Sequence, residues 1–365
     1  MDKLNKLISL CKQRGFIFQS SEIYGGLKSA YDYGPLGVEL KRNIAAEWWR
    51  SVVHEREDVV GLDASIIMHP KVWQASGHAA GFSDPLVDCL NCQERFRADK
   101  APQLKVGTEV TFRLGGKKKG EEKSGVVGDC GYVCPLCGSP NLSDERDFNL
   151  MFQTALGPVN ALNDFVNKVE GKSFSKKELK ELLEETLSKS RVYLRPETAQ
   201  AMFVQFLNIQ QSQGAKIPFG IAQQGKSFRN EITAEKYIFR TCEFEQMELE
   251  YFIEPGTHEK WLDYWKDERL SWWQRYSNNP ADFMLRKHEP DELAHYATDC
   301  YDIEHNYPWG FDELEGVASR TDYDLQKHDE YSGAKISYFD QQKQDPETGK
   351  KAVAMCHMLS SQQLA

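Results

Sequence analysis

Residues 227–252 read SFRNEITAEKYIFRTCEFEQMELEYF, and this stretch decides the fold. Apolar and aromatic residues recur at short spacing on both sides of a brief polar segment, which predicts two antiparallel strands joined by a loop at 233–237. Further short strands are predicted from Arg191 onward, separated by short turns and by a helical stretch at 257–276. The sequence therefore predicts an α+β fold built on an antiparallel sheet.

The second of these strands carries more charge than expected for a strand that only fills a core. A core strand carries little charge because burying unpaired charge is costly. A period of two places Gln246, Glu248 and Glu250 on one face, and Met247, Leu249 and Tyr251 on the other. The loop brings Arg229 and Arg240 together, and two guanidiniums suit phosphate oxygens. A carboxylate on the open face suits an ammonium group. The pattern fits a site for ATP and an amino acid, and it fits equally well a solvated face with cross-strand ion pairs.

Composition narrows the class of protein. The chain has 365 residues, a formal net charge of −10 and 40% hydrophobic residues. The acidic balance argues against wholesale non-specific binding to nucleic acid. No apolar run approaches the roughly 18 residues that span a membrane, and the polar first residues do not resemble a secretory signal. Scattered single cysteines fit a reducing compartment, so we expect a cytoplasmic protein.

Two CxxC pairs are formed by Cys89 with Cys92 and by Cys134 with Cys137. Each has the spacing that lets two thiolates bind one tetrahedral Zn²⁺. Four thiolates leave no open coordination position, so the metal is expected to be structural. The alternative is a set of unliganded thiols or a redox pair.

Several segments resemble the dimeric glycyl-tRNA synthetases. FRNE and RTCEFEQME resemble the second signature motif of class II aminoacyl-tRNA synthetases. The other segments are SEIYGGLKSAYDYGPLGVELKRN (21–43), PKVWQASGH (70–78), RFRAD (95–99), DFNLMF (147–152), YLRPETAQ (193–200) and SRTDYDL (319–325). The resemblance implies a class II antiparallel sheet flanked by helices, with a cysteine-rich zinc-binding insertion.

The resemblance also implies an activity. Glycine would attack the α-phosphate of ATP to give glycyl-adenylate, and the glycyl group would then pass to tRNA(Gly). No covalent enzyme intermediate forms, so the protein contributes positioning and charge stabilisation, with Mg²⁺ on the phosphates. The expected partners are glycine, ATP, tRNA and a second copy of the chain.

Site residues are carried over by motif position. The expected catalytic residues are Arg229, Glu231 and Arg240. The expected ATP-binding residues are Arg229, Asn230, Glu231, Phe239, Arg240, Thr241, Cys242, Glu243, Phe244, Glu313 and Leu314. The expected glycine-binding residues are Arg97, Glu197, Phe244, Glu245, Gln246, Met247 and Glu248, with Ser319 and Arg320 as further candidates. As alternatives, Glu197 only caps a helix, and Glu248 only pairs with a neighbouring arginine.

The expected domain organisation follows the same resemblance. Residues 1–82 form the N-terminal part of the catalytic domain with the dimer motif, and 83–147 form the zinc-binding insertion. Residues 148–351 form the catalytic core, with a charged helical insertion at about 160–190. Residues 352–365 form an aberrant tail, and an anticodon-binding domain is absent.

The sequence departs from the family pattern in two places. Cys242 stands where the family commonly has arginine, which removes a charge beside the nucleotide. After residue 351 the chain reads AVAMCHMLSSQQLA in place of the third class II motif. A frame shifted within the codon of Met355 can encode Val-Pro-His-Val-Ile-Glu-Pro-Ala-Ala-Gly, which resembles that motif. We therefore expect a frameshifted tail, a sheet that lacks a strand, and impaired charging of tRNA.

Two other function classes remain open at this point. The chain could be a synthetase-like paralogue that acts as a binding or regulatory module. It could also be an enzyme that adenylates an amino acid for an acceptor other than tRNA. Glycine-dependent exchange of pyrophosphate with ATP, with and without charging of tRNA, discriminates among the three.

Overall fold

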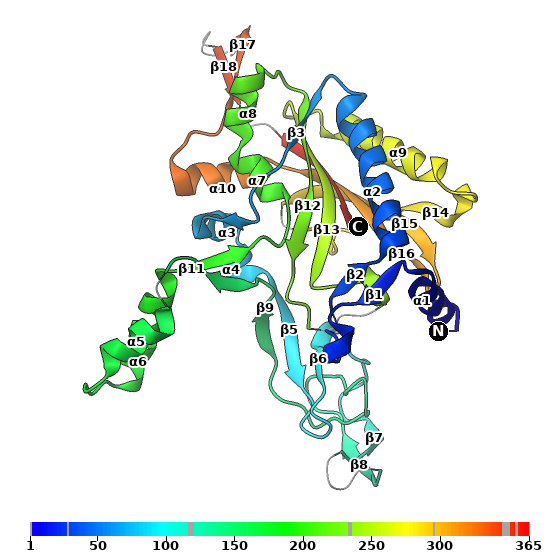
Figure 1. The fold of residues 1–365 in the computed structure, drawn as a ribbon, viewed down its shortest axis with the longest axis vertical. Coiled ribbons are helices and arrows are strands. Elements are labelled where there is room, and N and C mark those ends of the chain that lie inside the picture. Colours follow the sequence, from blue (N-terminus) through cyan, green and yellow to red (C-terminus); the bar gives the residue numbers. More distant parts are fainter. Residues whose placement is uncertain are drawn as a thin grey trace. The chain divides into compact units, whose positions relative to one another are not determined.

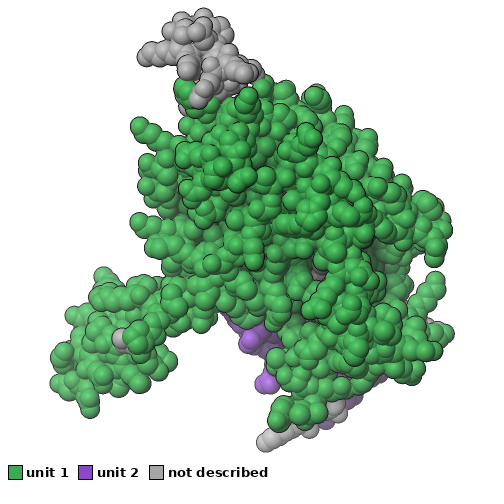
Figure 2. Space-filling model, turned by 45° about the horizontal axis from the view of Figure 1, so that its top comes forward, with its two compact units in different colours: residues 1–76, 152–228, 243–365 green, residues 77–151, 229–242 purple. Residues whose placement is uncertain are grey.

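The computed structural model describes residues 2–364 except 28, 116–119, 159, 233–235, 295, 345–350 and 355–356, with the backbone alone at residues 2, 340–344, 351–354 and 357–364 (Figure 1). The chain forms two compact units, coloured separately in Figure 2. The first comprises residues 1–76, 152–228 and 243–365, and the second comprises residues 77–151 and 229–242. The second unit contains the predicted insertion at 83–147. It also takes in the loop at 229–242, which the sequence analysis assigned to the catalytic core.

A seven-stranded sheet forms the centre of the first unit, with the strand order β14-β15-β16-β19-β13-β12-β3. The strands are β3 (Val59–Leu62), β12 (Phe219–Phe228), β13 (Glu243–Ile253), β14 (Phe283–Lys287), β15 (Ala297–Tyr307), β16 (Gly310–Arg320) and β19 (His357–Leu364). All neighbours are antiparallel except β12 and β3, which are parallel. The predicted α+β class with an antiparallel sheet is confirmed.

The predicted hairpin corresponds to β12 and β13, which pair from Phe219 opposite Phe252 to Phe228 opposite Glu243. The loop predicted at 233–237 falls partly on residues 233–235, which lie outside the described residues.

Two helices cover one face of this sheet, α2 (Pro35–Trp49) and α9 (His258–Arg275) (Figure 1). The π-helical turn η2 (Arg50–His54) continues α2. The buried core on this face contains Trp48, Val52, Met247, Leu249, Tyr251, Trp265 and Trp272. The predicted alternation along β13 is confirmed, because its three apolar side chains share this core.

Three helices pack against one end of the opposite face: α7 (Ala199–Val204), α8 (Phe206–Gln213) and α10 (Tyr323–Ser332). Their core contains Met202, Phe203, Phe206, Phe219, Phe252 and Leu325. Phe252 and Glu250 lie on the same face of β13, since they are two residues apart. That face is therefore apolar at Phe252 and polar from Glu250 to Gln246.

Smaller elements complete the first unit. They are α1 (Asp2–Arg14), β1 (Ile17–Gln19), η1 (Glu22–Tyr24), β2 (Tyr31–Tyr33), β4 (Ile67–Met68), α3 (Pro70–Ala75), β10 (Gln153–Ala155), α5 (Ala161–Val169), α6 (Lys176–Ser188), β11 (Arg191–Leu194), η6 (Pro280–Asp282), β17 (Tyr338–Gln344) and β18 (Lys351–Ala354). The helices α5 and α6 lie in the stretch at about 160–190 that the sequence predicted to be a charged helical insertion. The capping box of α6 pairs the side chain of Ser175 with the backbone of Glu178, and the side chain of Glu178 with the backbone of Ser175.

The second unit consists of short strands and loops around its own core. Its elements are α4 (His78–Gly81), β5 (Ser83–Asp88), β6 (Arg95–Arg97), η3 (Ala98–Lys100), β7 (Glu109–Arg113), β8 (Glu122–Val126), β9 (Arg146–Asn149) and η5 (Tyr237–Phe239). Strand β5 lies between β6 and β9, and β7 pairs with β8. Cys89 and Cys134 are buried here beside Val87, Phe96 and Tyr132.

The strand β19 corrects the expectation that the tail leaves the sheet short of a strand. Its backbone pairs with β13 on one edge and with β16 on the other, so Ser361 lies opposite both Leu249 and Val317. The physical reason is that ladder hydrogen bonds join backbone groups, which every residue except proline carries. An unexpected side-chain sequence can therefore still fill the central position.

We predict that Ser361→Pro lowers the free energy of unfolding by about 2 kcal/mol or more, because proline removes a ladder donor and leaves a buried acceptor unpaired. Ser361→Thr keeps the N–H and serves as the control. Urea unfolding followed by circular dichroism measures both. Equal midpoints for the proline variant and the parent chain would contradict the position of β19.

Candidate functional site

The second unit gathers three arginines around one carboxylate. Arg240 lies 3.7 Å from Glu231, whose side chain is only 9% exposed. Burial raises the pKa of Glu231, while the charges of Arg240, Arg229 and Arg97 oppose that rise. Arg229 also stacks on Phe82, with its guanidinium carbon 5.4 Å from the ring centre. The predicted catalytic residues Arg229, Glu231 and Arg240 thus lie in one cluster of opposite charges.

Arg97 belongs to the same cluster but already has acidic partners. Its guanidinium lies 2.7 Å from Asp84 and binds Asp99 through two nitrogens, at 2.8 and 3.0 Å. The hydrogen bond to Asp99 raises the pKa of Arg97 against the effect of burial. A ligand carboxylate at Arg97 would have to share the guanidinium with these two side chains.

Backbone hydrogen bonds hold the loop that carries these residues. The Arg229 N–H donates to the Cys242 carbonyl at 2.9 Å, and the Asn230 N–H donates to the Leu150 carbonyl at 2.8 Å. Phe239 ends η5, with the ammonium of Lys236 5.3 Å from its ring. Of the other predicted ATP residues in this loop, Thr241 is buried and Cys242 is half-buried.

The polar face of β13 is pre-formed in the first unit. Gln246 and Glu248 are fully buried. The Oε1 of Gln246 accepts from the hydroxyl of Ser227 at 2.7 Å and from the N–H of Thr198 at 3.2 Å. The hydroxyl of Thr198 donates to Glu248. These contacts hold two predicted glycine-binding residues in one orientation.

The neighbouring residues of β13 require a correction. Met247 is buried in the core beneath α2 and α9, and Glu245 pairs with Lys41 of α2. Both side chains therefore point away from the face of Gln246, and the structure argues against glycine contacts by these two side chains. Glu243 pairs with Lys226 across the hairpin, while Phe244 is half-buried.

Glu313 lies on β16 near Gly316, which has no side chain to fill the space beside the Glu313 carboxylate. A Cβ at Gly316 would lie 3.6 Å from a carboxylate oxygen of Glu313 and 3.8 Å from one of Asp302. Asp302 is bound by Arg286 and His288, each at 2.8 Å. Leu314, the next predicted ATP residue, is half-buried. Glu313 itself is exposed, so it remains accessible to a ligand.

A buried polar network surrounds Glu197. Gln200 donates to Glu197 and to Asp324, and Asp324 accepts from Arg320. Burial alone would lower the pKa of Arg320, but nearby acidic groups, of which Asp324 acts most strongly, raise it well above its ordinary value. The guanidinium also lies 4.0 Å from the ring centre of Tyr296. Arg320 thus remains charged beside a half-buried carboxylate.

Sequence reasoning missed three members of this network, Gln200, Asp324 and His328. A signal was present, because Asp324 and His328 are four residues apart and share one face of α10. Such a polar pair is usually interpreted as solvent-facing, yet both residues are buried here. Gln223, opposite Glu248 in the hairpin and fully buried, was missed as well.

The four cysteines of the two CxxC pairs converge in the second unit. Their sulfurs lie within 4.8 Å of one another, and the Cys89–Cys137 and Cys92–Cys134 separations are both 3.7 Å. Tetrahedral ligation with Zn–S bonds of 2.3 Å requires sulfurs about 3.8 Å apart. Asn91 donates to Cys137 at 3.4 Å. The donor set and its spacing therefore fit Zn²⁺.

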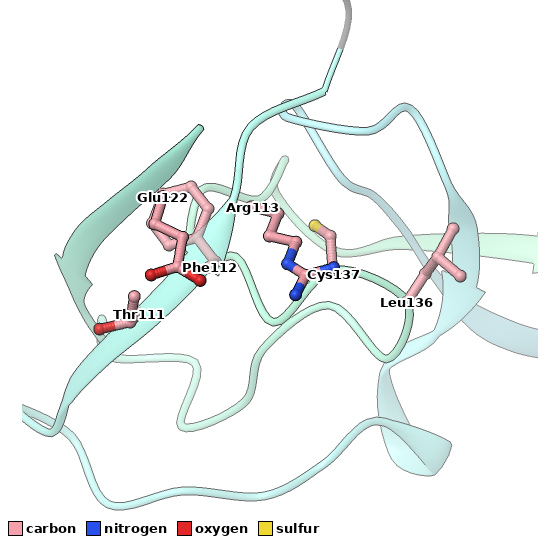
Figure 3. A pocket seen from close by; sticks show the side chains of 6 residues that line it. All are labelled: Thr111, Phe112, Arg113, Glu122, Leu136 and Cys137. Atoms are coloured by element: carbon pink, nitrogen blue, oxygen red, sulfur yellow. The ribbon is translucent and has the colours of Figure 1, made fainter. Parts of the chain in front are cut away.

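A small pocket opens beside this cluster (Figure 3). It is lined by Thr111, Phe112 and Arg113 of β7, Glu122 of β8, and Leu136 and Cys137 of the second CxxC pair. The pocket contains none of the residues predicted for ATP or glycine.

Sequence similarity to known proteins identifies the family of this chain. Over 338 residues the chain is 48% identical to the glycine–tRNA ligase of Treponema denticola, covering 93% of this chain and 64% of that protein. It is 46% identical over 354 residues to the glycine–tRNA ligase of Ruminiclostridium cellulolyticum, covering 97% of this chain and 70% of that protein. The chain belongs to the glycine–tRNA ligase family. It spans about two thirds of the length of these relatives, and no family model matches it.

Solved structures confirm the fold of this ligase-family chain. A prolyl-tRNA synthetase of Giardia lamblia in complex with prolyl-adenylate matches with a TM-score of 0.57 and 11% identity, covering 100% of this chain and 50% of that one. A Cryptosporidium parvum prolyl-tRNA synthetase with L-proline and AMP matches with a TM-score of 0.52 and 9% identity, over 96% of this chain and 48% of that one. The predicted class II catalytic fold is therefore confirmed.

In the part of the chain that the structure describes, no helix combines the length and the apolar character needed to cross a bilayer.

We predict a pH-dependent stability term from His328. Burial lowers its pKa below the ordinary value of 6.5, so the folded chain binds fewer protons there than the unfolded chain. The free energy of unfolding is therefore highest above pH 6.5. It decreases as the pH drops toward the lowered pKa of His328 in the folded chain, by up to about 1.4 kcal/mol per pH unit. The variant His328→Gln does not titrate and should lose less stability between pH 7.5 and 5.5, measured by urea unfolding. Equal losses would show that His328 titrates normally.

Proposed function

We propose that this chain activates glycine with ATP as glycyl-adenylate and transfers the glycyl group to tRNA(Gly). The observation that carries the proposal is that a charged Arg320 and the half-buried carboxylate of Glu197 belong to one hydrogen-bonded network in the first unit, joined through Asp324 and Gln200. Glycine carries one ammonium and one carboxylate, so a site that offers one carboxylate and one guanidinium complements both ends. The names of the relatives, glycine–tRNA ligases, support the same substrate.

The surroundings of Glu197 and Arg320 favour a small amino acid. The neighbouring side chains Gln246, Glu248 and Asp324 are buried and held by hydrogen bonds. A larger substrate would have to displace them and leave buried polar groups unpaired, which is costly. A site of this kind selects glycine by lack of room.

The ATP half of the proposal uses the cluster of the second unit. Arg229 and Arg240 would bind phosphate oxygens, since planar guanidiniums bind such groups bidentately. Glu231 would hold the two guanidiniums in place before ATP arrives. In the first unit, the exposed carboxylate of Glu313 is our candidate ligand for Mg²⁺, the ion that supplies charge neutralisation on the phosphates of ATP. Catalysis would then consist of aligning the glycine carboxylate with the α-phosphate.

The test is glycine-dependent exchange of labelled pyrophosphate into ATP, followed by charging of tRNA(Gly). Exchange together with charging supports the proposal. Exchange without charging supports an enzyme with another acceptor, and neither activity supports a binding or regulatory module. Alanine in place of glycine serves as the substrate control, since the proposed site has no room for a side chain.

We further propose a structural Zn²⁺ at Cys89, Cys92, Cys134 and Cys137, a homodimer, and a cytoplasmic location. The matching S···S separations support the metal. The family resemblance of residues 21–43 supports the dimer. The scattered cysteines of a chain without paired disulfide spacing support the cytoplasm.

We predict that Cys134→Ser lowers thermal stability and reduces bound zinc from about one atom per chain to less than half of that, because it removes a ligand from a closed site. Elemental analysis after anaerobic purification gives the stoichiometry, and a melting curve gives the stability. Cys130→Ser is the matched control, since Cys130 is exposed and lies outside the cluster. A metal-free parent chain would contradict the prediction.

We predict that Glu197→Ala weakens glycine binding about tenfold or more, with little effect on ATP, because it removes the partner of an ammonium group. Arg229→Ala should weaken ATP binding and spare glycine. Titration calorimetry with each ligand measures both. Glu185→Ala and Arg275→Ala are controls at exposed positions. Loss of the same ligand in both site variants would refute this division of the site.

A further inference from the structure

One amide group in the first unit links two carboxylates. The Nε2 of Gln200 donates to Oε1 of Glu197 and to Oδ1 of Asp324, both at 2.9 Å. Gln200 has no exposed surface, and its Oε1 lies 2.8 Å from Nε2 of His328. Both hydrogens and the oxygen of this amide are therefore used.

The orientation of the amide follows from the charges around it. Ionised carboxylates only accept hydrogen bonds, so the NH₂ group of Gln200 must face Glu197 and Asp324. The amide oxygen then faces His328, whose Nε2 must carry a proton and donate it. Both the neutral Nε2–H tautomer and the imidazolium can do so. The ring of His328 thus determines which end of Gln200 meets the two carboxylates.

The second carboxylate extends the linkage to an arginine. The Oδ2 of Asp324 accepts from Nε and Nη2 of Arg320, at 3.1 and 2.8 Å. Glu197, Gln200, Asp324 and Arg320 therefore form one continuous chain of hydrogen bonds. A displacement of the amide would move both the carboxylate at one end and the guanidinium at the other.

From this geometry we infer that Gln200 and His328 are positioning residues that set the spacing between the carboxylate of Glu197 and the guanidinium of Arg320. The inference rests on the proposed function, in which those two groups bind the ammonium and the carboxylate of glycine. Because a single carbon separates the two charged ends of glycine, the site tolerates little variation in that spacing. Gln200 and His328 would act on glycine affinity without contacting glycine.

The pre-set spacing also has an energetic role. A carboxylate that is already held loses less side-chain freedom when the ligand binds. Two carboxylates at one site repel each other, and an amide that donates to both compensates for the repulsion. Losing the amide would let Glu197 move away from Asp324, so glycine would have to bring it back.

The experiment compares four variants by titration calorimetry with glycine and, separately, with ATP. Gln200→Met keeps the length of the side chain but removes all three hydrogen bonds, so glycine should bind about tenfold more weakly while ATP binds within about twofold of the parent. Gln200→Glu presents an oxygen to Glu197 and Asp324 and should weaken glycine binding at least as much. His328→Leu frees the amide and should also weaken it, whereas His328→Gln keeps a donor and should restore most of the affinity.

The control is Gln211→Met, the same substitution on the exposed side of α8. Melting curves identify any variant that fails to fold. If Gln200→Met does not fold, His328→Leu becomes the deciding variant. The inference is overturned if a folded variant loses affinity for glycine and for ATP by the same factor, or loses affinity for neither ligand. In that case glycine binding by the parent chain still supports the proposed function. A parent chain that binds no glycine overturns the proposed function and the inference together.

Discussion

The two-residue period of β13 is the constraint on which the first unit depends. The strand is hydrogen-bonded on both edges, to β12 and to β19, so its register is determined from two sides. A slip of one residue would send Met247, Leu249 and Tyr251 to the polar face and bury Glu248 and Glu250 among tryptophans. The core beneath α2 and α9 therefore determines, at the same time, which side chains lie on the opposite face.

Each face of the sheet carries a buried ion pair. On the helix side, Arg269 of α9 binds Glu315 at 2.7 Å, and Trp273 donates to the same carboxylate. On the polar side, Arg320 binds Asp324. Arg320 ends β16 and Arg269 binds Glu315 of the same strand, so β16 connects the ion pair on the helix side to the ion pair of the proposed glycine site. Removing one member of such a pair costs far more than the pair contributes, because the remaining charge stays buried.

The sequence predicted what depends on local pattern. The alternation of β13, the antiparallel hairpin and the α+β class follow from spacing alone, and the family follows from short motifs. The predicted glycine-binding residues were taken from the family motif as one continuous run. That run included Met247, although the alternation of β13 already placed Met247 on the core face. The contacts of Gln200 were not visible, because Asp324 and His328 reach it only through the packing of α10 on α7. The position of β19 was missed because ladder pairing leaves little trace in side-chain chemistry.

The central position of β19 has a consequence for how the first unit acquires its structure. The hairpins β12–β13 and β15–β16 pair neighbours in sequence and can form early, whereas β19 joins them only after residues 357–364 have been synthesised. Until then the inner edges of β13 and β16 expose unpaired backbone groups, which are templates for pairing with other chains. The nascent protein therefore holds an open sheet until residues 357–364 have been synthesised, and closure of that sheet is a long-range event that competes with aggregation.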